Sequence, residues 1–143
     1  MLIHQISVFV ENRTGRLSDI TGVLARNNID IRALSIADTT DFGILRLIVN
    51  EPEKAVAALK GEGITVSKTE VVAVRLADEP GALHDILEAL RERDIVVEYA
   101  YAFLTRKDAD ACVILRVEDN EKAVEALKTK GQTLLTGAEL YGM

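Results

Sequence analysis

Hydrophobic residues in the first half of the chain recur first at every second position and then at every third or fourth position. Ile6, Val8 and Val10 recur at every second position, the pattern of a β-strand with one buried face. Downstream, apolar residues recur every three or four positions, the pattern of an amphipathic helix. Asn50 is expected to be the N-cap of a second helix, with Pro52 in its first turn. The pattern predicts strand, helix, strand, strand, helix and strand, at about residues 6–10, 15–28, 29–37, 42–49, 51–60 and 64–66.

The second half of the chain repeats the first. Matching residues at the same offset are Gly15 and Gly81, Leu17 and Leu83, Ile20 and Ile86, and Leu24 and Leu90. Further along, Leu45-Arg46-Leu47 matches Leu115-Arg116-Val117, with a few residues added in the preceding turn. Agreement over nearly the whole length identifies a duplication. It predicts the same six elements in the second half, at about residues 72–76, 81–90, 95–104, 111–117, 122–130 and 133–135.

The order of elements predicts an α+β fold. Two strand–helix–strand crossovers of one hand place both helices on one face of a four-stranded antiparallel sheet, the ferredoxin-like βαββαβ arrangement. We therefore expect two tandem modules, at residues 1–68 and 69–143. No flexible linker separates them, because the segment between Val66 and Val72 is short and strand-like.

The sheet face opposite the helices is predicted to be partly apolar. If Leu45, Leu47 and Val49 face the helices, the alternate positions face away from them. Those positions are Ile44, Arg46 and Ile48 in the first half and Cys112, Ile114 and Arg116 in the second, beside the aromatic row Tyr99, Tyr101 and Phe103. An apolar open face favours cover by another module or by a second subunit, so we expect a homodimer. Scattered apolar surface residues are the alternative.

Composition excludes several classes of partner. The 143 residues carry a net charge of −6 without a basic stripe, which argues against nucleic-acid binding. No apolar run approaches a membrane span, and the N-terminus does not resemble a signal segment. The single cysteine, Cys112, rules out an internal disulfide and fits a reducing cytoplasm. The sequence therefore favours a cytoplasmic protein without nucleic-acid or membrane partners.

The sequence gives little indication of a catalytic site or a metal-binding site. Two separated histidines and one cysteine do not make a zinc site. Phosphate-binding loops and dinucleotide fingerprints are not found. We expect no catalytic residue, no metal ligand and no cofactor, hence a protein that is not an enzyme. A small enzyme on this scaffold is the alternative, because fold does not fix function.

A polar turn, Asn12-Arg13-Thr14-Gly15-Arg16-Leu17, joins the first strand to the first helix. Unpaired N–H groups at a helix start favour an anion such as a carboxylate. Gly15 permits close approach because it has no Cβ, and the Asn12 amide offers donors and an acceptor. These properties suit an α-amino acid. The alternative is that Asn12 and Thr14 only cap the helix and Gly15 only makes the turn.

This turn, its copy Asp78-Glu79-Pro80-Gly81-Ala82-Leu83 and the order of elements resemble the ACT domain family. The first half resembles the regulatory subunit of acetolactate synthase and the regulatory domain of 3-phosphoglycerate dehydrogenase. The resemblance covers the whole chain as a tandem pair without a catalytic domain. It implies regulatory binding of a free amino acid or a similar small carboxylate. It also leaves open a subunit that docks on a separate enzyme, such as acetolactate synthase or an aryl-CoA ligase.

The resemblance also implies where the ligand binds. In the family it lies between the first strand–helix turn of one domain and the second strand of a neighbour. The matching positions are Asn12, Gly15 and Asp30 in the first half and Asp78, Gly81 and Val96 in the second. Val96 offers no side-chain hydrogen bond, and an ionised Asp78 only accepts. We therefore expect the ligand at the first turn, with the second copy supplying the neighbouring wall or the dimer contact. Arg13 and Arg16 are candidates to bind an anion, and the alternative is that they are solvated surface arginines.

Overall fold

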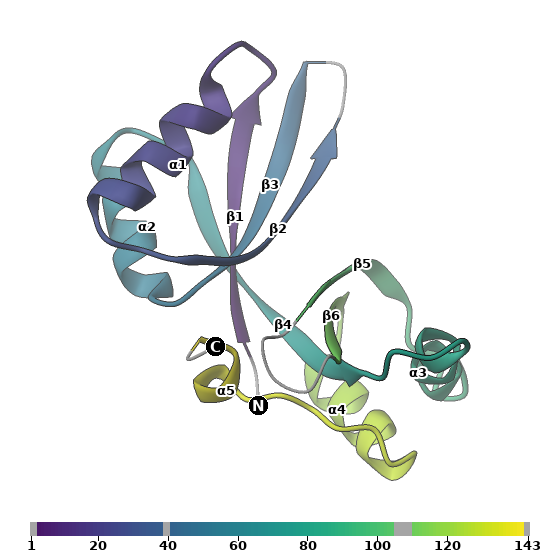
Figure 1. Cartoon of the computed structure of the whole chain (residues 1–143). Coiled ribbons are helices and arrows are strands. Elements are labelled where there is room, and N and C mark those ends of the chain that lie inside the picture. The colour runs from purple at the N-terminus through teal and green to yellow at the C-terminus, as the bar shows by residue number, and fades with distance from the viewer. Residues whose placement is uncertain (1–2, 39–40, 105–109, 142–143) are drawn as a thin grey trace. The chain divides into compact units, whose positions relative to one another are not determined.

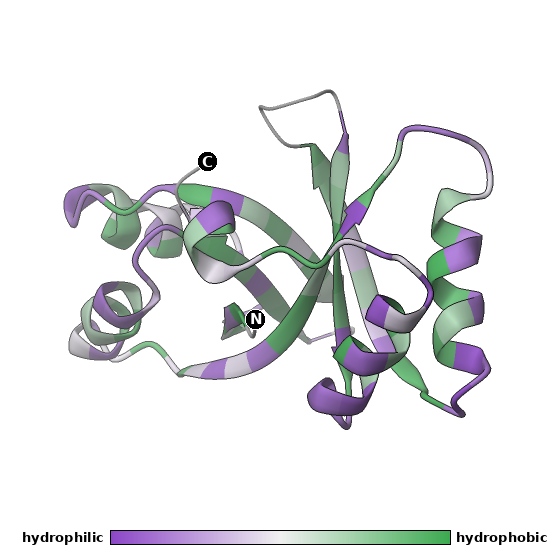
Figure 2. Cartoon of the chain, turned by 90° about the horizontal axis from the view of Figure 1, so that it is seen from below, coloured by the Kyte–Doolittle hydropathy of each residue, from purple (hydrophilic) through white to green (hydrophobic). Residues whose placement is uncertain are grey.

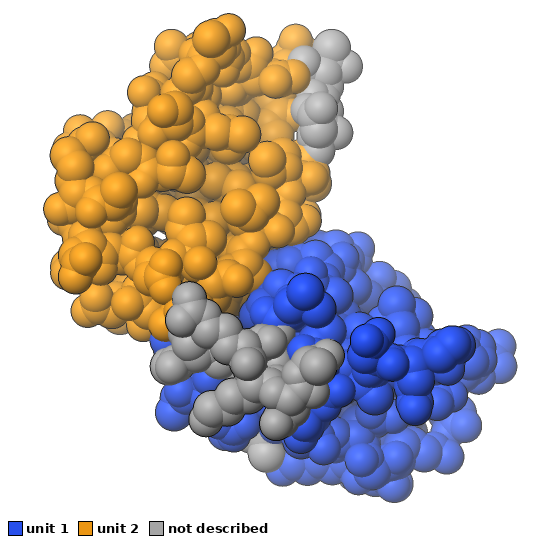
Figure 3. Space-filling model, in the orientation of Figure 1, with its two compact units in different colours: residues 1–3, 70–141, 143 blue, residues 4–69, 142 orange. Residues whose placement is uncertain are grey.

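The computed structural model describes residues 3–38, 41–104 and 110–141. These residues form two compact units (Figure 3). We call residues 4–69 the first module, and residues 70–141 together with Ile3 the second module. Within the described residues, no helix is both long and apolar enough to cross a membrane.

The first module has the predicted ferredoxin-like topology. Its strands are β1 (Ile3–Glu11), β2 (Ile31–Asp38), β3 (Phe42–Val49) and the start of β4 (Val66–Leu76), in the order β2-β3-β1-β4. Both β1 and β2 pair antiparallel with β3, and the Phe9 amide donates to the Thr65 carbonyl at 3.1 Å. The helices α1 (Arg16–Arg26) and α2 (Pro52–Gly61) lie on one face of this sheet (Figure 1).

The second module repeats this topology, with the rest of β4 as its first strand. Helices α3 (Ala82–Arg91) and α4 (Asn120–Thr129) alternate with β5 (Val97–Leu104) and β6 (Ala111–Val117). The strand order is β4-β6-β5, and both neighbouring pairs are antiparallel. The fourth strand that the sequence predicts at residues 133–135 is reduced to one bridge, between Val74 and Leu134. A short helix that the sequence did not predict, α5 (Gly137–Tyr141), follows it.

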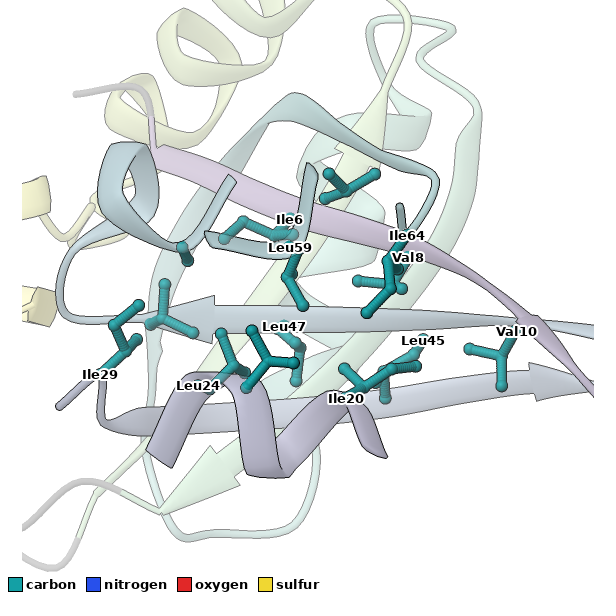
Figure 4. Close-up of a cluster of buried hydrophobic side chains, with 14 residues drawn as sticks. Ile6, Val8, Val10, Ile20, Leu24, Ile29, Leu45, Leu47, Leu59 and Ile64 are labelled. Carbon is teal, nitrogen blue, oxygen red and sulfur yellow. The ribbon is translucent and has the colours of Figure 1, made fainter. Parts of the chain in front are cut away.

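Each module has its own hydrophobic core between the sheet and its two helices. In the first module, Ile6, Val8 and Leu47 meet Leu24 from α1 and Leu59 from α2 (Figure 4). The helices alternate hydrophobic and hydrophilic residues around their circumference, as an amphipathic helix requires (Figure 2). The helix-facing positions predicted on β3, which are Leu45, Leu47 and Val49, all belong to this core.

The sheet faces opposite the helices carry the predicted apolar side chains. Ile48, Cys112 and Ile114 are fully buried, whereas Ile44 is 38% exposed. The cross-strand register places the aromatic row of β5 on the same face as Cys112 and Ile114, and its side chains are half-buried. The pairs are Tyr99 with Arg116, Tyr101 with Ile114, and Phe103 with Cys112.

The two copies share local irregularities as well as topology. Asn28 and Asp94 both adopt a left-handed backbone, with φ of 56° and 55°, directly after the first helix of each module. Both edge strands have a register shift at the same place, between Ile31 and Ala33 and between Val97 and Tyr99. The duplication therefore holds at the level of single backbone conformations.

Two sequence predictions were wrong in detail. Asn50 is not a helix N-cap, because α2 is capped at Glu51. Asn50 instead accepts the Asp30 amide through Oδ1 at 2.9 Å and donates its own amide to the Asp30 carbonyl at 3.1 Å. An Asn before a helix satisfies either pattern of hydrogen bonds, so sequence alone does not separate them.

The second error concerns the alignment of β3 with β6. Leu47 pairs with Ile6 and Leu115 pairs with Val72, so Leu47 corresponds to Leu115 and not to Val117. A shift of two residues keeps every side chain on its face, which is why the hydrophobic pattern did not reveal it.

Truncation of equivalent core leucines tests the two cores separately. Leu24→Ala and Leu90→Ala each remove a side chain that is at most 1% exposed, from the first and second core respectively. Each is expected to lower the free energy of unfolding by about 2–5 kcal/mol. Urea denaturation followed by circular dichroism measures this. Leu17→Ala, at a 41% exposed position, is the control and should cost much less; an equal cost would contradict the assigned cores.

Candidate functional site

The turn between β1 and α1 is held by backbone hydrogen bonds. The Arg13 amide donates to the Glu11 carbonyl at 2.9 Å, and the Asp19 amide donates to the Gly15 carbonyl at 2.9 Å. The Asn12 amide donates to the carbonyl of Asp41 at 3.0 Å. The turn is therefore fastened to the end of the β2–β3 hairpin.

The turn between β4 and α3 has the same backbone. The Glu79 amide donates to the Ala77 carbonyl at 2.9 Å, and the Asp85 amide donates to the Gly81 carbonyl at 3.0 Å. The predicted equivalence of the two turns is thus correct in geometry. Differences between them lie in the side chains.

Gly15 and Gly81 are the N-caps of α1 and α3, with φ of 83° and 91°. This left-handed conformation favours glycine, and a Cβ at either position would meet nothing within 4 Å. The turn therefore needs glycine for its backbone conformation. Because a glycine N-cap has no side chain, it leaves the first N–H groups of the helix without the usual side-chain acceptor.

Side-chain charge at the first turn centres on Arg16, the first residue of α1. Its side chain is only 18% exposed, and among the described residues its buried Nε has no hydrogen-bond partner. In the described part of the chain, its ion-pair partner is Asp19, whose Oδ2 lies 4.0 Å from an Arg16 terminal nitrogen. Arg13, by contrast, is exposed and pairs with Glu11 at 3.2 Å. Arg16 therefore supplies a positive charge that Asp19 neutralises weakly.

The second turn has the opposite electrostatic character. Ala82 occupies the position equivalent to Arg16. A hollow of about 190 Å³ beside this turn is lined by Glu79, Asp85 and Asp110, with Arg75 as a basic residue. Arg75 Nε already pairs with Asp110 Oδ2 at 2.7 Å. Negative charge therefore dominates, and this turn disfavours a carboxylate.

The structure does not bring Asn12 and Asp30 together within one module. They lie at opposite ends of α1, whose 11 residues span about 16 Å. The Asp30 carboxylate pairs with Arg32 at 2.8 Å, a partner that the sequence reasoning missed. A ligand that binds between this turn and the second strand of a domain therefore needs a second strand from outside this module.

Val96, the position equivalent to Asp30, is 74% exposed. It borders a cleft of about 620 Å³ in the second module, which the sequence reasoning also missed. The polar lining of the cleft is Glu70, Asp94, Glu118, Asp119, Asn120, Glu121 and Lys122. This acidic surface is formed by residues from three separate segments, so no single stretch of sequence signals it.

The remaining predicted site residues lie on or next to the two turns. In the first turn Asn12, Arg13, Thr14, Gly15 and Leu17 are exposed, and Arg16 is half-buried. In the second turn Asp78, Glu79, Pro80, Gly81 and Leu83 are exposed, and Ala82 is half-buried. Each set forms one contiguous surface within its own module.

Comparisons with known proteins agree with this architecture. The profile of the ACT domain pair family matches residues 1–143. The chain is a member of this family. The predicted tandem ACT arrangement is therefore confirmed.

Among solved structures, this ACT domain pair is similar to protein BT0572 from Bacteroides thetaiotaomicron. The identity is 41% and the TM-score 0.94, over 100% of this chain and 98% of that one. The regulatory subunit of aspartate kinase from Thermus thermophilus, in its ligand-free form, has 17% identity and a TM-score of 0.65, over 90% and 93%. The corresponding subunit from Thermus flavus has 17% identity and a TM-score of 0.61, over 92% and 94%. At that identity the two Thermus structures show the shared fold alone. A comparison with curated proteins finds no match.

Neither metal binding nor thiol chemistry is visible in the described part of this ACT pair. No group of three or more His, Cys, Asp or Glu residues there is placed to hold a metal ion. Cys112 lies fully buried on β6, and burial raises the pKa of its thiol to about 12. The thiol is therefore protonated at neutral pH and poorly nucleophilic.

The glycine of the ACT turn gives a direct test of backbone strain. Gly15→Ala forces a Cβ into the left-handed region and should lower the free energy of unfolding by about 1–2 kcal/mol. Gly22→Ala, inside α1, is the control; its Cβ would meet only the flexible end of Arg26 at 3.3 Å. Helix propensity favours alanine there, so stability should rise by up to about 1 kcal/mol. Equal effects in thermal denaturation would contradict the assigned turn.

Thiol labelling tests the environment of Cys112. With 5,5′-dithiobis(2-nitrobenzoate) at pH 8, the native protein should react far more slowly than the protein in 6 M guanidinium, because only the unfolded thiol ionises appreciably. The raised folded pKa also implies stability that is complete below the unfolded value near 9 and declines as the pH rises towards 12. Rapid labelling of the native protein would show that Cys112 is accessible.

Proposed function

We propose that this ACT domain pair is a non-catalytic regulatory protein that binds a free amino acid, or a similar small carboxylate, at its first turn. The observation that carries the proposal is the state of Arg16. Its side chain is largely buried at a helix start, and among the described residues its Nε has no hydrogen-bond partner and its ion-pair partner, Asp19, lies 4.0 Å away. An incoming carboxylate would satisfy this charge.

The helix start supports the same ligand class. Leu17 and Ser18 lie in the first turn of α1, where backbone N–H groups have no intrahelical acceptor. The partial positive charge of the helix end adds to the charge of Arg16. Asn12 borders this surface, and its amide group suits the polar atoms of an α-amino acid.

The ammonium group of the ligand needs a carboxylate, and Asp30 is the proposed residue. Because Asp30 of the same module lies at the far end of α1, it must come from a neighbouring second strand. Ligand binding would then favour one packing of the neighbours over another. Such coupling is typically worth about 1–3 kcal/mol.

Docking on a separate enzyme of amino-acid metabolism is a second candidate. It is favoured by the match with the Thermus thermophilus protein, which is described as a regulatory subunit and is covered over 93% of its length. A chain of this size with this fold therefore exists as a subunit in another protein. The two candidates are compatible, because a subunit can also bind a ligand.

A thermal-shift screen against the twenty amino acids tests ligand binding. A true ligand at about 100 times its dissociation constant should stabilise the protein by roughly 2.7 kcal/mol. Arg16→Ala, which reproduces the residue of the second turn, removes a charged hydrogen-bond donor worth about 1.5–3 kcal/mol. Affinity for the responding amino acid should therefore fall roughly 10- to 150-fold, as measured by calorimetry.

Arg13→Ala is the matched control for Arg16→Ala, because Arg13 lies in the same turn but is exposed and paired with Glu11. It should change affinity little. Asn12→Ala should weaken binding, whereas Asp78→Ala, its equivalent in the second module, should not. If no amino acid stabilises the wild type, the sensor proposal fails and docking on an enzyme gains weight. If Asp78→Ala abolishes the response, the site lies at the second turn.

A further inference from the structure

The ion pair between Arg16 and Asp19 is wider than a direct contact. A hydrogen bond between a guanidinium and a carboxylate is about 2.7–2.9 Å long. The distance from Arg16 Nη1 to Asp19 Oδ2 is 4.0 Å. The Asp19 side chain is 61% exposed, and among the described residues its carboxylate accepts no hydrogen bond. The two opposite charges are therefore adjacent, yet each has room for another partner.

The spacing of these two charges matches an α-amino acid. In such a ligand the ammonium nitrogen and the carboxylate carbon are about 2.5 Å apart, because both are bonded to the same Cα. When the ligand carboxylate contacts Arg16 and the ligand ammonium contacts Asp19, the charged groups form a closed ring in which positive and negative alternate. A separation of 4.0 Å lets both contacts form together, whereas a direct Arg16–Asp19 contact would occupy the atoms that the ligand needs.

We propose that Asp19 makes the first turn select an α-amino acid over a simple carboxylate. It accepts a hydrogen bond from the ammonium group of the ligand, while Arg16 binds the carboxylate. This inference rests on the proposed function. It adds an acceptor from the same module to Asp30, since an ammonium group donates several hydrogen bonds. A ligand without an amino group would bring its negative charge beside Asp19 and be repelled.

The neighbouring ion pair in this turn, between Arg13 and Glu11, is arranged differently. Arg13 Nε lies 3.2 Å from Glu11 Oε2, so each charge already has a close partner. The Arg13 side chain is 59% exposed, against 18% for Arg16. A partly buried guanidinium has fewer rotamers to lose when it binds a ligand than an exposed one. Arg16 therefore fixes the position of the ligand carboxylate, and Asp19 contacts the group bonded next to it.

The second turn has the aspartate without the arginine. Asp85 is equivalent to Asp19, and the amides of both donate to the carbonyl of the N-cap glycine, at 3.0 and 2.9 Å. Ala82 stands in the place of Arg16. An acidic residue in the first turn of a helix also interacts favourably with the helix dipole, and this role is common to both copies. Asp85 can therefore separate the dipole interaction from ligand selection.

Calorimetry with matched pairs of ligands tests this selection. The probes are the twenty amino acids and, for each, the carboxylic acid without its amino group, such as acetate for glycine and propionate for alanine. The wild type should bind an amino acid more tightly than its counterpart. In Asp19→Asn, affinity for the amino acid should fall roughly 10-fold, because a hydrogen bond between charged groups is lost. Affinity for the counterpart should rise roughly 3-fold, because the repulsion is removed.

Asp85→Asn is the matched control, because it removes the equivalent charge beside alanine instead of arginine. It should leave both affinities unchanged. In thermal denaturation, both variants should lose a similar and small amount of stability, since each removes a negative charge from the first turn of a helix. A purely structural role of Asp19 would shift the two affinities in the same direction, whereas the proposed role shifts them in opposite directions.

The outcomes separate this inference from the proposed function. If the wild type binds an amino acid and Asp19→Asn keeps the same preference over the counterpart, the inference fails and the proposed function stands. A wild type that binds the counterpart as tightly as the amino acid also overturns the inference, and leaves carboxylate binding intact. If no probe binds the wild type or Asp19→Asn, both fail. A preference that Asp19→Asn abolishes and Asp85→Asn retains supports both.

Discussion

The antiparallel pairing of the central strands fixes almost everything else in each module. Once Ile6 lies opposite Leu47, or Val72 opposite Leu115, the alternation of side chains determines which residues face the helices. The same register brings the end of β1 beside the β2–β3 hairpin, where the Asn12 amide meets the Asp41 carbonyl. The sheet therefore positions the strand-to-helix turn. The left-handed backbone at the glycine then directs the chain from the strand into the helix.

The two copies keep the same backbone conformation at the turn, whereas their side chains there differ. The two turns share their internal backbone hydrogen bonds and have nearly the same glycine φ, yet Arg16 corresponds to Ala82 and Asp30 to Val96. A backbone specified by core packing tolerates such exchanges, because these side chains lie outside the two hydrophobic cores. The two turns therefore have the same backbone conformation and differ in the charge of their side chains.

Features set by hydrophobic period and by glycine could be predicted from the sequence. The strands, the four main helices and both turns follow from such local signals. The Asn50–Asp30 hydrogen bonds, the two-residue offset of β6 and the bridge at Leu134 depend on partners distant in sequence, so no local pattern reports them. The turn residues were predicted, but the weak neutralisation of Arg16 was not, because a spacing of three residues does not fix the distance to Asp19.

The inequality of the two turns has a consequence for stoichiometry. If only the turn with Arg16 holds a carboxylate, the chain binds one ligand equivalent although it contains two ACT domains. A two-fold dimer would then hold two ligands, and its Hill coefficient could not exceed two. Steeper responses, such as those of four-site assemblies, would require further association of dimers. Under the proposed function, the presence of alanine at the position equivalent to Arg16 would limit how sharply the protein responds to ligand concentration.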